Sequence, residues 1–264
     1  MLSRISKRTW FTVLALVLIT LVLSGCAPST THTVKTEDLL QGNFWEKNVV
    51  YWFALMLDTF ATWFGGEYGL AILLLTIIVR TLILPLTLKQ YRSSKAMQAL
   101  QPELAKIKEK HKDNPQKQQE ETMKLFQQHQ VNPLAGCLPL IVQMPIFIAL
   151  YNSIYWNPLI REHSFLGIKM GVPVNEQDWY AYILPVLAAL TTFVQSKMMA
   201  SQQKTMPMMQ GIMLIFPVLI FVMALSFPAA LPLYWIFSNL YTIVQNYFLY
   251  VRSSSKGKES VPAK

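Results

Sequence analysis

The sequence predicts an all-α membrane protein with five transmembrane helices, a cytosolic two-helix hairpin and an outer interfacial helix. Of its 264 residues, 53% are hydrophobic and only 14% are charged, whereas a soluble domain carries roughly 25% charged residues. The hydrophobic residues also lie in long blocks and not in amphipathic stripes. Several blocks approach the ~20 residues that a transmembrane helix requires.

Residues 1–25 have the pattern of a lipoprotein signal peptide. A basic start is followed by an apolar run that ends at Leu23-Ser-Gly-Cys26. This order is typical of a secretory signal, and Leu-Ser-Gly-Cys resembles the bacterial lipoprotein box. We therefore expect lipidation, as by palmitate, at Cys26 and a mature N-terminus outside the cell. The alternative is an uncleaved signal anchor in which Cys26 is incidental.

Residues 26–67 are predicted to form an exterior segment with an amphipathic helix. The stretch 44–64 is rich in aromatic residues, but Asp58 and two other charged residues interrupt it. We expect this helix to lie on the outer membrane surface, and Gly65-Gly66 to turn the chain into the first span. Counting 44–64 as a span would place the nine Lys and Arg of segment 89–133 outside, against the positive-inside rule.

Residues 68–251 are predicted to form a five-span core. The hydrophobic blocks that can span a bilayer are 68–88, 134–155, 178–195, 207–225 and 231–251. With the N-terminus outside, five spans place the C-terminus in the cytosol. The cytosolic segments then hold 15 Lys and Arg and the exterior segments hold 4, as the positive-inside rule requires.

Segment 89–133 is predicted to form the cytosolic hairpin. Its pattern consists of helically spaced apolar residues, a turn and a second apolar group: Met97, Leu100, Leu104 and Ile107, then Asp113-Asn-Pro115, then Met123, Leu125 and Phe126. Such a pattern indicates two helices joined by a turn. Residues 252–264 are predicted to be a basic flexible tail.

Arg80 is the strongest indication of function. It lies within the first hydrophobic block, where a charged residue costs roughly 2.5 kcal/mol on insertion scales. No acidic residue occurs between Glu67 and Glu103 to neutralise it. We therefore expect water to reach Arg80 inside the membrane.

Other polar residues also occur within the hydrophobic blocks. In the last block they are spaced i, i+4, i+7 and i+11, which is one face of a helix. The candidate groove residues are Thr76, Arg80, Gln143, Gln195, Tyr234, Ser238, Tyr241 and Gln245. We expect them to line a wet groove open to the cytosolic half of the membrane. Two alternatives stay open: the neutral residues only join helices by hydrogen bonds, and Tyr234 is an interfacial anchor.

Several other function classes are disfavoured. Cys26 and Cys137 lack the spacing of a metal site and no Walker-type loop occurs, so we expect no metal and no cofactor. The net charge is +9, and the Lys and Arg residues alternate between rich and poor segments. This distribution is typical of topology signals, so we expect no specific binding of nucleic acid. A small-solute transporter or channel is the alternative function, although inverted-repeat symmetry and an acidic proton relay are lacking. An intramembrane enzyme is disfavoured because the spans hold no catalytic cluster.

Four segments carry a resemblance to a known family. They are Ile77-Ile-Val-Arg-Thr-Leu-Ile-Leu-Pro-Leu86, Met97-Gln-Ala-Leu-Gln-Pro-Glu-Leu-Ala-Lys-Ile-Lys108, Asn132-Pro-Leu-Ala-Gly-Cys-Leu-Pro-Leu-Ile-Val-Gln-Met-Pro-Ile-Phe-Ile-Ala-Leu-Tyr151 and Leu231-Pro-Leu-Tyr-Trp-Ile-Phe-Ser-Asn-Leu-Tyr241. They resemble the YidC/Oxa/Alb family of membrane protein insertases, in its short five-span lipoprotein form.

The resemblance implies a function, a location and partners. It implies an insertase, not an enzyme, in the bacterial plasma membrane, acting alone or beside the Sec translocon. Nascent membrane proteins such as the ATP synthase rotor subunit are the implied substrates, and the ribosome is a further candidate partner. Arg80 would be the functional charge of the groove, which Gln195 and the polar residues of the last span also line. We expect Arg80 to attract acidic residues of the substrate.

Overall fold

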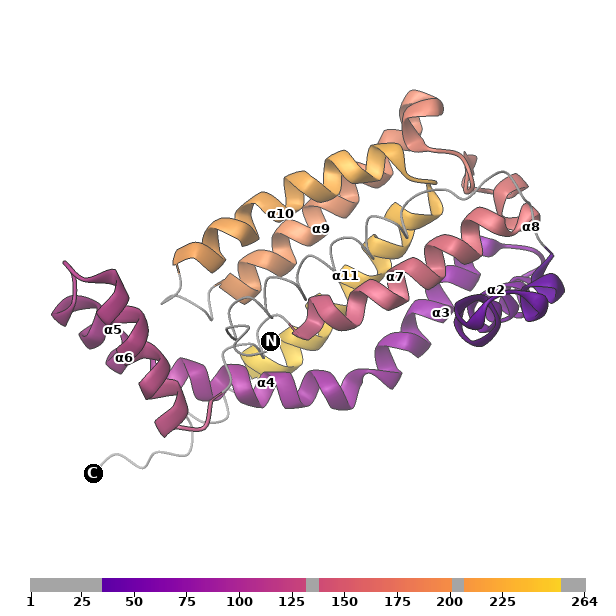
Figure 1. Cartoon of the computed structure of the whole chain (residues 1–264). Coiled ribbons are helices and arrows are strands. Elements are labelled where there is room, and N and C mark those ends of the chain that lie inside the picture. The colour runs from indigo at the N-terminus through magenta and orange to yellow at the C-terminus, as the bar shows by residue number, and fades with distance from the viewer. Residues whose placement is uncertain (1–34, 132–137, 201–206, 253–264) are drawn as a thin grey trace, which may run out of the picture.

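Helices form most of the chain in the computed structural model, which describes residues 35–131, 138–200 and 207–252 (Figure 1). The long helices of the described chain run side by side as a bundle. They are α3 (Tyr68–Leu82), α7 (Leu138–Trp156), α9 (Ile183–Ala200), α10 (Pro207–Ser226) and α11 (Ala230–Asn246), the last continuing as η6 (Tyr247–Arg252). Helix α9 packs against α10 and α11, and α11 also packs against α3. Each of these helices overlaps one predicted hydrophobic block.

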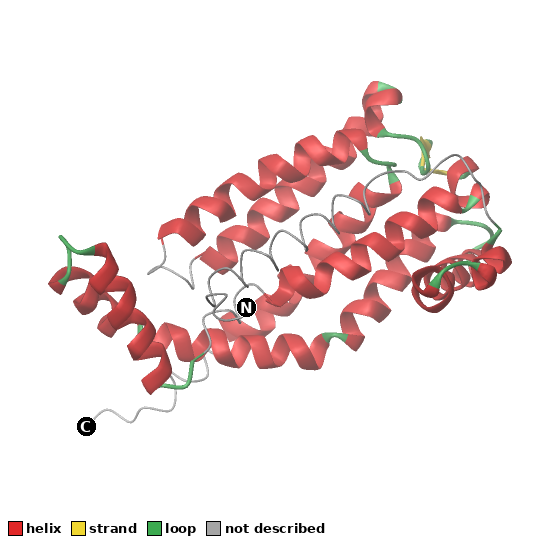
Figure 2. Cartoon of the chain, viewed as in Figure 1, coloured by secondary structure: helices red, strands yellow, loops and turns green. Residues whose placement is uncertain are grey.

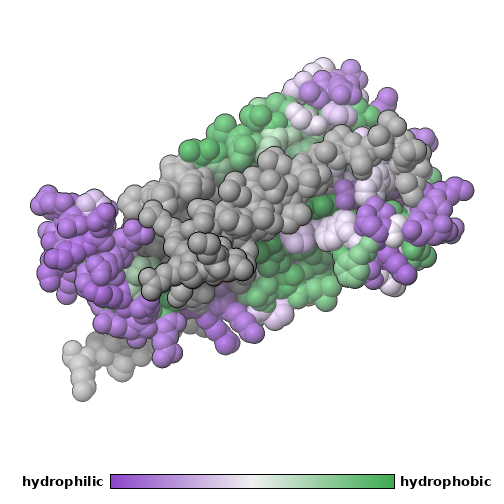
Figure 3. Space-filling view, in the orientation of Figure 1, coloured by the Kyte–Doolittle hydropathy of each residue, from purple (hydrophilic) through white to green (hydrophobic). Residues whose placement is uncertain are grey.

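The predicted helical fold is confirmed, but the number of spans stays a prediction. Among the described residues, Trp179–Met199 is long and apolar enough to cross a membrane by itself. The bent pair α3 and α4 (Leu84–Ala99) qualifies if it is counted as one span. Two shorter apolar helices cover Ile141–Trp156 and Ile215–Ser226. Figure 3 shows hydrophobic side chains along the middle of the bundle and hydrophilic side chains at both ends.

The first hydrophobic block is not one straight helix. Helix α3 ends at Leu82, and α4 leaves it at an angle of 56°. Pro85 lies in the first turn of α4, and proline both lacks a backbone N–H donor and clashes with the preceding turn. The predicted span 68–88 therefore contains a break after Leu82, and its bounds and those of the hairpin 89–133 stay predictions. The chain bends at Ile83, and α4 leads away from the bundle (Figure 1).

Helices α5 (Gln101–Lys110) and α6 (Pro115–Gln128) pack against each other beyond α4. Their small core consists of Leu100, Leu104, Leu125 and Phe126. The residues of the predicted turn form the N-terminal cap of α6. Asn114 Oδ1 accepts a hydrogen bond from the Lys117 amide at 3.0 Å, and Pro115 is the first residue of the helix. Met123 lies in α6, as the pattern predicted, but its side chain is 43% exposed and lies outside this core.

The opposite end of the bundle carries η1 (Thr36–Gln41), η2 (Glu46–Val50) and α2 (Tyr51–Trp63). One side of α2 packs on α3 and α7 through buried residues such as Leu57, whereas Trp52 and Trp63 are exposed. Gly65 and Gly66 have φ values of 68° and 98°, which favour glycine, and they turn the chain into α3. Helix α2 therefore has apolar side chains both on its buried side and on its exposed side. Its place on the membrane surface stays a prediction.

Asp58, in α2, joins the group of η1, η2 and α2 to the bundle. Its carboxylate accepts hydrogen bonds from Thr36 Oγ1 at 2.6 Å, Tyr68 Oη at 2.8 Å and Asn157 Nδ2 at 2.8 Å. Asn157 in turn begins the short helix α8 (Pro158–Glu162), because its Oδ1 accepts from the helix's first amides. Hydrogen bonds to a charged acceptor are the stronger kind. Asp58 interrupts a hydrophobic stretch of sequence because three elements meet at its side chain.

A β-hairpin that the sequence pattern did not reveal follows α8. Strands β1 (Ser164–Phe165) and β2 (Ile168–Lys169) pair antiparallel, with Leu166 and Gly167 between them (Figure 2). The strands are two residues long, too short for alternation to be detected in the sequence. This hairpin lies at the same end of the bundle as α2.

Candidate functional site

The guanidinium of Arg80 lies between α3, α7 and α11. Its Nε donates a hydrogen bond to Ser238 Oγ at 3.0 Å, and its Nη2 donates to Gln143 Oε1 at 3.1 Å and also to Ser238 Oγ. Gln143 Nε2 then donates to Tyr234 Oη at 2.6 Å. Four predicted site residues from three helices thus form one hydrogen-bonded network.

The positive charge of Arg80 is held by neutral partners. Within the described part of the chain, no carboxylate forms an ion pair with it. Ser238 and Gln143 supply dipoles that partly replace water, and arginine stays charged in proteins. A partly buried charge without a counter-ion attracts an acidic group strongly, because the local dielectric constant is well below that of water.

Polar groups continue from Arg80 toward the end of α11 that is remote from α2. Tyr241 Oη lies 3.2 Å from Thr81 Oγ1, next in sequence to Arg80. Gln245 follows Ser238 by seven residues, about 10 Å along the helix. The Gln245 Nε2 and Gln195 Oε1 atoms are both buried and have no hydrogen-bond partner among the described residues. An unpaired buried polar atom costs about 1–3 kcal/mol, so atoms of this kind in native proteins usually bond water or another polar group.

Thr76 lies in a different environment from the one expected. Its side chain is 2% exposed, and its hydroxyl donates to the Ile72 carbonyl of its own helix at 2.6 Å. A threonine in a helix can satisfy its donor in this way without any polar neighbour. Thr76 is therefore on the same helix as Arg80 but does not join the network.

An aromatic cluster lies on the other side of the Arg80 network, toward α2 and α8. Phe147 and Trp235 stack in parallel with ring centres 5.4 Å apart. Phe227 meets both rings edge-on, and Tyr151 contacts Phe227 in the same way. Phe147 follows Gln143 by one helical turn, and Trp235 precedes Ser238 by about one turn. The cluster therefore packs directly beyond the network.

The geometry distinguishes between the two interpretations of Tyr234. The side chain is 4% exposed and accepts the hydrogen bond from Gln143 inside the bundle, so it is no interfacial anchor. A helix-joining role is found instead at Asn239, whose Nδ2 donates to Thr191 Oγ1 at 3.1 Å and to Thr192 Oγ1 at 2.8 Å. Asn239 was not among the predicted site residues. The sequence feature that could have identified it is its type and place, an asparagine next to Ser238 within the last hydrophobic block.

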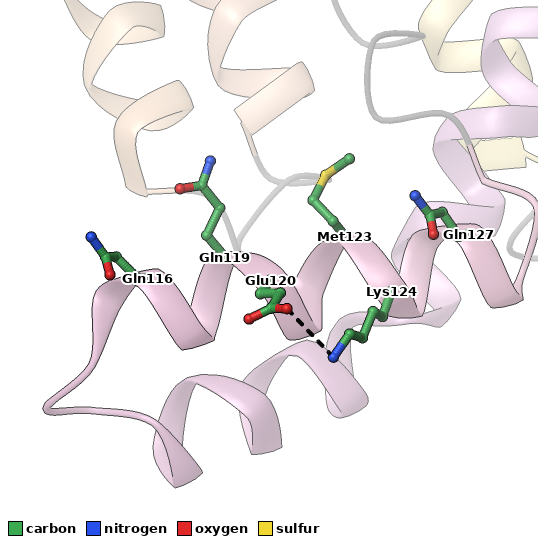
Figure 4. Close-up of a pocket in the computed structure, with 6 residues that line it drawn as sticks. All are labelled: Gln116, Gln119, Glu120, Met123, Lys124 and Gln127. Atoms are coloured by element: carbon green, nitrogen blue, oxygen red, sulfur yellow. Dashed lines mark ion pairs between the residues drawn. The ribbon is translucent and has the colours of Figure 1, made fainter. Parts of the chain in front are cut away.

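A second candidate surface lies on α6. A shallow hollow of about 440 Å³ is lined by Gln116, Gln119, Glu120, Met123, Lys124 and Gln127. Figure 4 shows Gln119 and Met123 pointing to the same side of the helix. Lys124 forms ion pairs with Glu120 at 3.8 Å and Glu121 at 2.9 Å, and its ammonium holds the pKa of the Glu121 carboxyl below its usual value.

Some predicted features lie outside the described residues. Cys26, with the signal peptide and the lipidation prediction, falls in 1–34, and Cys137 falls in 132–137. Most of the basic tail falls in 253–264.

Comparisons with known proteins agree with one another. The family model described as 60Kd inner membrane protein matches residues 59–256. The membrane protein insertase MisCA of Bacillus subtilis is 47% identical over 248 residues, covering 92% of each chain. The membrane protein insertase YidC of Oceanobacillus iheyensis is 43% identical over 244 residues, covering 88% of this chain and 92% of its own.

A solved structure is also similar. It is the crystal structure of an active YidC insertase with its first transmembrane domain resolved, at 31% identity and a TM-score of 0.60. The match covers 79% of this chain but 48% of that one, so the chain spans about half the length of the solved protein.

Proposed function

Because the chain belongs to the 60Kd inner membrane protein family, with membrane protein insertases as its relatives, we propose that it moves short polar segments of nascent membrane proteins through a hydrophilic groove around Arg80. The chain is itself a membrane protein insertase of the bacterial cell membrane, and not an enzyme in the catalytic sense. The groove, the topology and the individual partners are the parts that we propose.

The observation that carries the proposal is the environment of Arg80. A guanidinium bonded to the neutral Ser238 and Gln143 keeps its attraction for a carboxylate. At about 4 Å and an effective dielectric constant near 20, one such attraction is worth about 4 kcal/mol. This is enough to draw an acidic residue of a substrate to the site.

The direction of entry follows from what lies on either side of Arg80. Toward α2, the stacked Phe147 and Trp235 offer no polar path. Toward the other end, Gln245 Nε2 and Gln195 Oε1 have no hydrogen-bond partner among the residues that the structure describes. We propose that this second side opens to the cytosol. In this topology the mature N-terminus and α2 are outside and the C-terminus is cytosolic, as the distribution of basic residues favours.

The proposed mechanism needs no nucleotide. The polar part of the substrate enters the groove and is held near Arg80, while its apolar helix moves along the lipid-facing side into the bilayer. Each Leu, Ile, Phe or Val of that helix contributes about 0.3–0.6 kcal/mol on insertion scales. A helix of this kind therefore gains several kcal/mol, and this gain draws the polar part across.

The remaining roles extend this mechanism. The α5–α6 pair, with the hollow around Met123, would receive the nascent chain on the cytosolic side. We propose nascent membrane proteins such as the ATP synthase rotor subunit as substrates, with the Sec translocon and the ribosome as partners. A lipid at Cys26 would anchor the mature N-terminus in the outer leaflet.

Site-specific crosslinking tests the groove. A photoreactive residue in place of Gln245 or Ser238 should form adducts with ribosome-bound nascent chains, and one in place of the lipid-facing Val218, which is 63% exposed, should form far fewer. Equal yields at all three positions would contradict a groove. Ion flux through purified vesicles without substrate would instead support the transporter or channel alternative.

A further inference from the structure

The turn of the β-hairpin places a large apolar residue in an unusual backbone conformation. Leu166 and Gly167, the two residues between β1 and β2, have φ values of 53° and 81°. Positive φ is ordinary for glycine but uncommon for a leucine, and the residues that tolerate it best are asparagine and aspartate. The Leu166 side chain is also 84% exposed, so it is not placed there to fill a core.

This turn is firmly attached to the bundle. The Phe165 ring lies so close to Gly69 of α3 that a β-carbon at Gly69 would come within 2.3 Å of it. The Gln177 side chain bonds both the amide and the carbonyl of Lys169 at 2.9 Å, and Tyr180 Oη donates to the Gly167 carbonyl at 3.3 Å. The exposed Leu166 is therefore held on a rigid support.

The surface beside the turn is apolar as well. Trp179, adjacent to Tyr180, is 85% exposed and begins the apolar helix Trp179–Met199. Along that helix, Ile183 and Leu190 remain 56% and 54% exposed, as expected of a face in contact with lipid. Trp179 thus stands at the start of this apolar helix, and the hydrogen bond from Tyr180 to Gly167 ties the hairpin tip with Leu166 to the same end of it.

We propose that Leu166 and Trp179 form an anchor that inserts into the boundary between headgroups and acyl chains of the outer leaflet. Tryptophan is enriched at this depth because its ring is amphipathic. The side assigned to the anchor rests on the proposed topology, but the anchor is independent of the chemistry at Arg80. Phospholipid is the favoured occupant because Trp179 begins the apolar helix Trp179–Met199, whose exposed side chains include Ile183 and Leu190.

The anchor also has a consequence for the groove. The hairpin packs on Gly69 through Phe165. Just before the hairpin, His163 Nε2 lies 3.4 Å from Oε2 of Glu67, the residue that precedes α3. Arg80 follows Gly69 by eleven residues, about 16 Å along the helix. Fixing the hairpin tip in the outer leaflet would therefore fix the depth of Arg80 in the bilayer.

Photocrosslinking in vesicles tests which class of molecule covers the tip. The full chain, carrying p-benzoylphenylalanine at Leu166 or Trp179, is reconstituted into vesicles of phosphatidylethanolamine and phosphatidylglycerol and also examined in native membranes. Phospholipid adducts are expected at both positions, and not at the exposed Glu176 used as the control. Adducts mainly with another protein in native membranes, or lipid adducts no more frequent at 166 than at 176, would overturn the proposal.

A substitution separates an anchor from a simple turn. Leu166→Asn suits the left-handed backbone better, so the melting temperature should stay the same or rise. The anchor nevertheless predicts a several-fold loss of lipid adducts from p-benzoylphenylalanine at Trp179, and slower substrate insertion. Leu166→Met should retain both. If Leu166→Asn keeps the adduct yield and the insertion rate of the unmodified chain, the leucine has no anchoring role.

Discussion

Arg80 and Ser238 are separated by 158 positions in the sequence, yet the Arg80 Nε lies 3.0 Å from the Ser238 Oγ. This hydrogen bond joins α3 to α11 at the point where Gln143 of α7 also reaches the guanidinium. The arginine is thus oriented by three helices while its charge stays unpaired within the described residues. An oriented but uncompensated charge is what a groove for acidic polar segments requires.

The charge of Arg80 can be tested by substitution. Arg80→Lys should retain much of the insertion activity, because the positive charge remains. Arg80→Ala should lose activity for substrates with acidic translocated segments, and Arg80→Glu should lose more, since an attraction of about 4 kcal/mol becomes a repulsion. The control is an insertion assay with a substrate whose acidic residues are neutralised. With that substrate, the unmodified protein and the Arg80→Ala variant should insert at similar rates. An active Ala variant with an inactive Lys variant would indicate a packing role.

Solvent access to the groove can be tested with engineered cysteines. In a background without Cys137, a cysteine at Gln245 should react with a water-soluble thiol reagent from the cytosolic side. A cysteine at Thr76 should not, because Thr76 is 2% exposed, in contrast to what the sequence pattern predicted. The matched control is Leu74 on the same helix, which should also stay unmodified. If the cysteine at Gln245 is as unreactive toward the reagent as the cysteine at Thr76, the proposal of a water-filled groove is contradicted.

The aromatic cluster should act as a seal. Replacing Phe147 or Trp235 by serine removes the stacked pair next to the polar network, so water gains a continuous path. Purified vesicles with either variant are expected to leak small ions, whereas the unmodified protein should not. Phe147→Tyr retains the ring and serves as the control. Tight vesicles with the serine variants would locate the seal elsewhere.

Asp58 should matter for stability more than for substrate charge. Asp58→Ala leaves the Tyr68 hydroxyl and the Asn157 amide without their acceptor, so we expect a loss of about 2–3 kcal/mol in the free energy of unfolding. Asp58→Asn keeps one acceptor oxygen and should lose less. Thermal unfolding in detergent measures both. The ratio of insertion rates for acidic and neutral substrates should not change, and a change would assign Asp58 a role in the groove.

Removal of residues 97–126 should impair recruitment of substrates more than folding of the bundle. The α5–α6 pair has its own small core around Leu104 and Phe126, so its loss need not disturb the other helices. The measurement is crosslinking of nascent chains together with the melting temperature of the remaining protein. Normal insertion by the deleted protein would show that the hairpin is not the receptor.

The sequence by itself predicted the helical fold and singled out Arg80 as a candidate site residue, and the resemblance of four segments predicted the family. The fold and the choice of Arg80 depend on local and compositional properties: long apolar blocks, a charge within one of them, and turn residues such as Asn114 and Pro115. Such signals remain visible in a linear chain because each is a property of neighbouring residues.

Only the tertiary structure decided which polar residues meet. Thr76 and Ser238 are equally plausible in sequence, yet the first bonds its own helix and the second bonds Arg80. The bend at Ile83, the hairpin with Leu166 at its tip and the junction at Asp58 were likewise beyond the sequence pattern. The reason is physical: the rotation and depth of each helix follow from packing against helices far away in the chain, and a polar side chain finds its partner only after that packing is set.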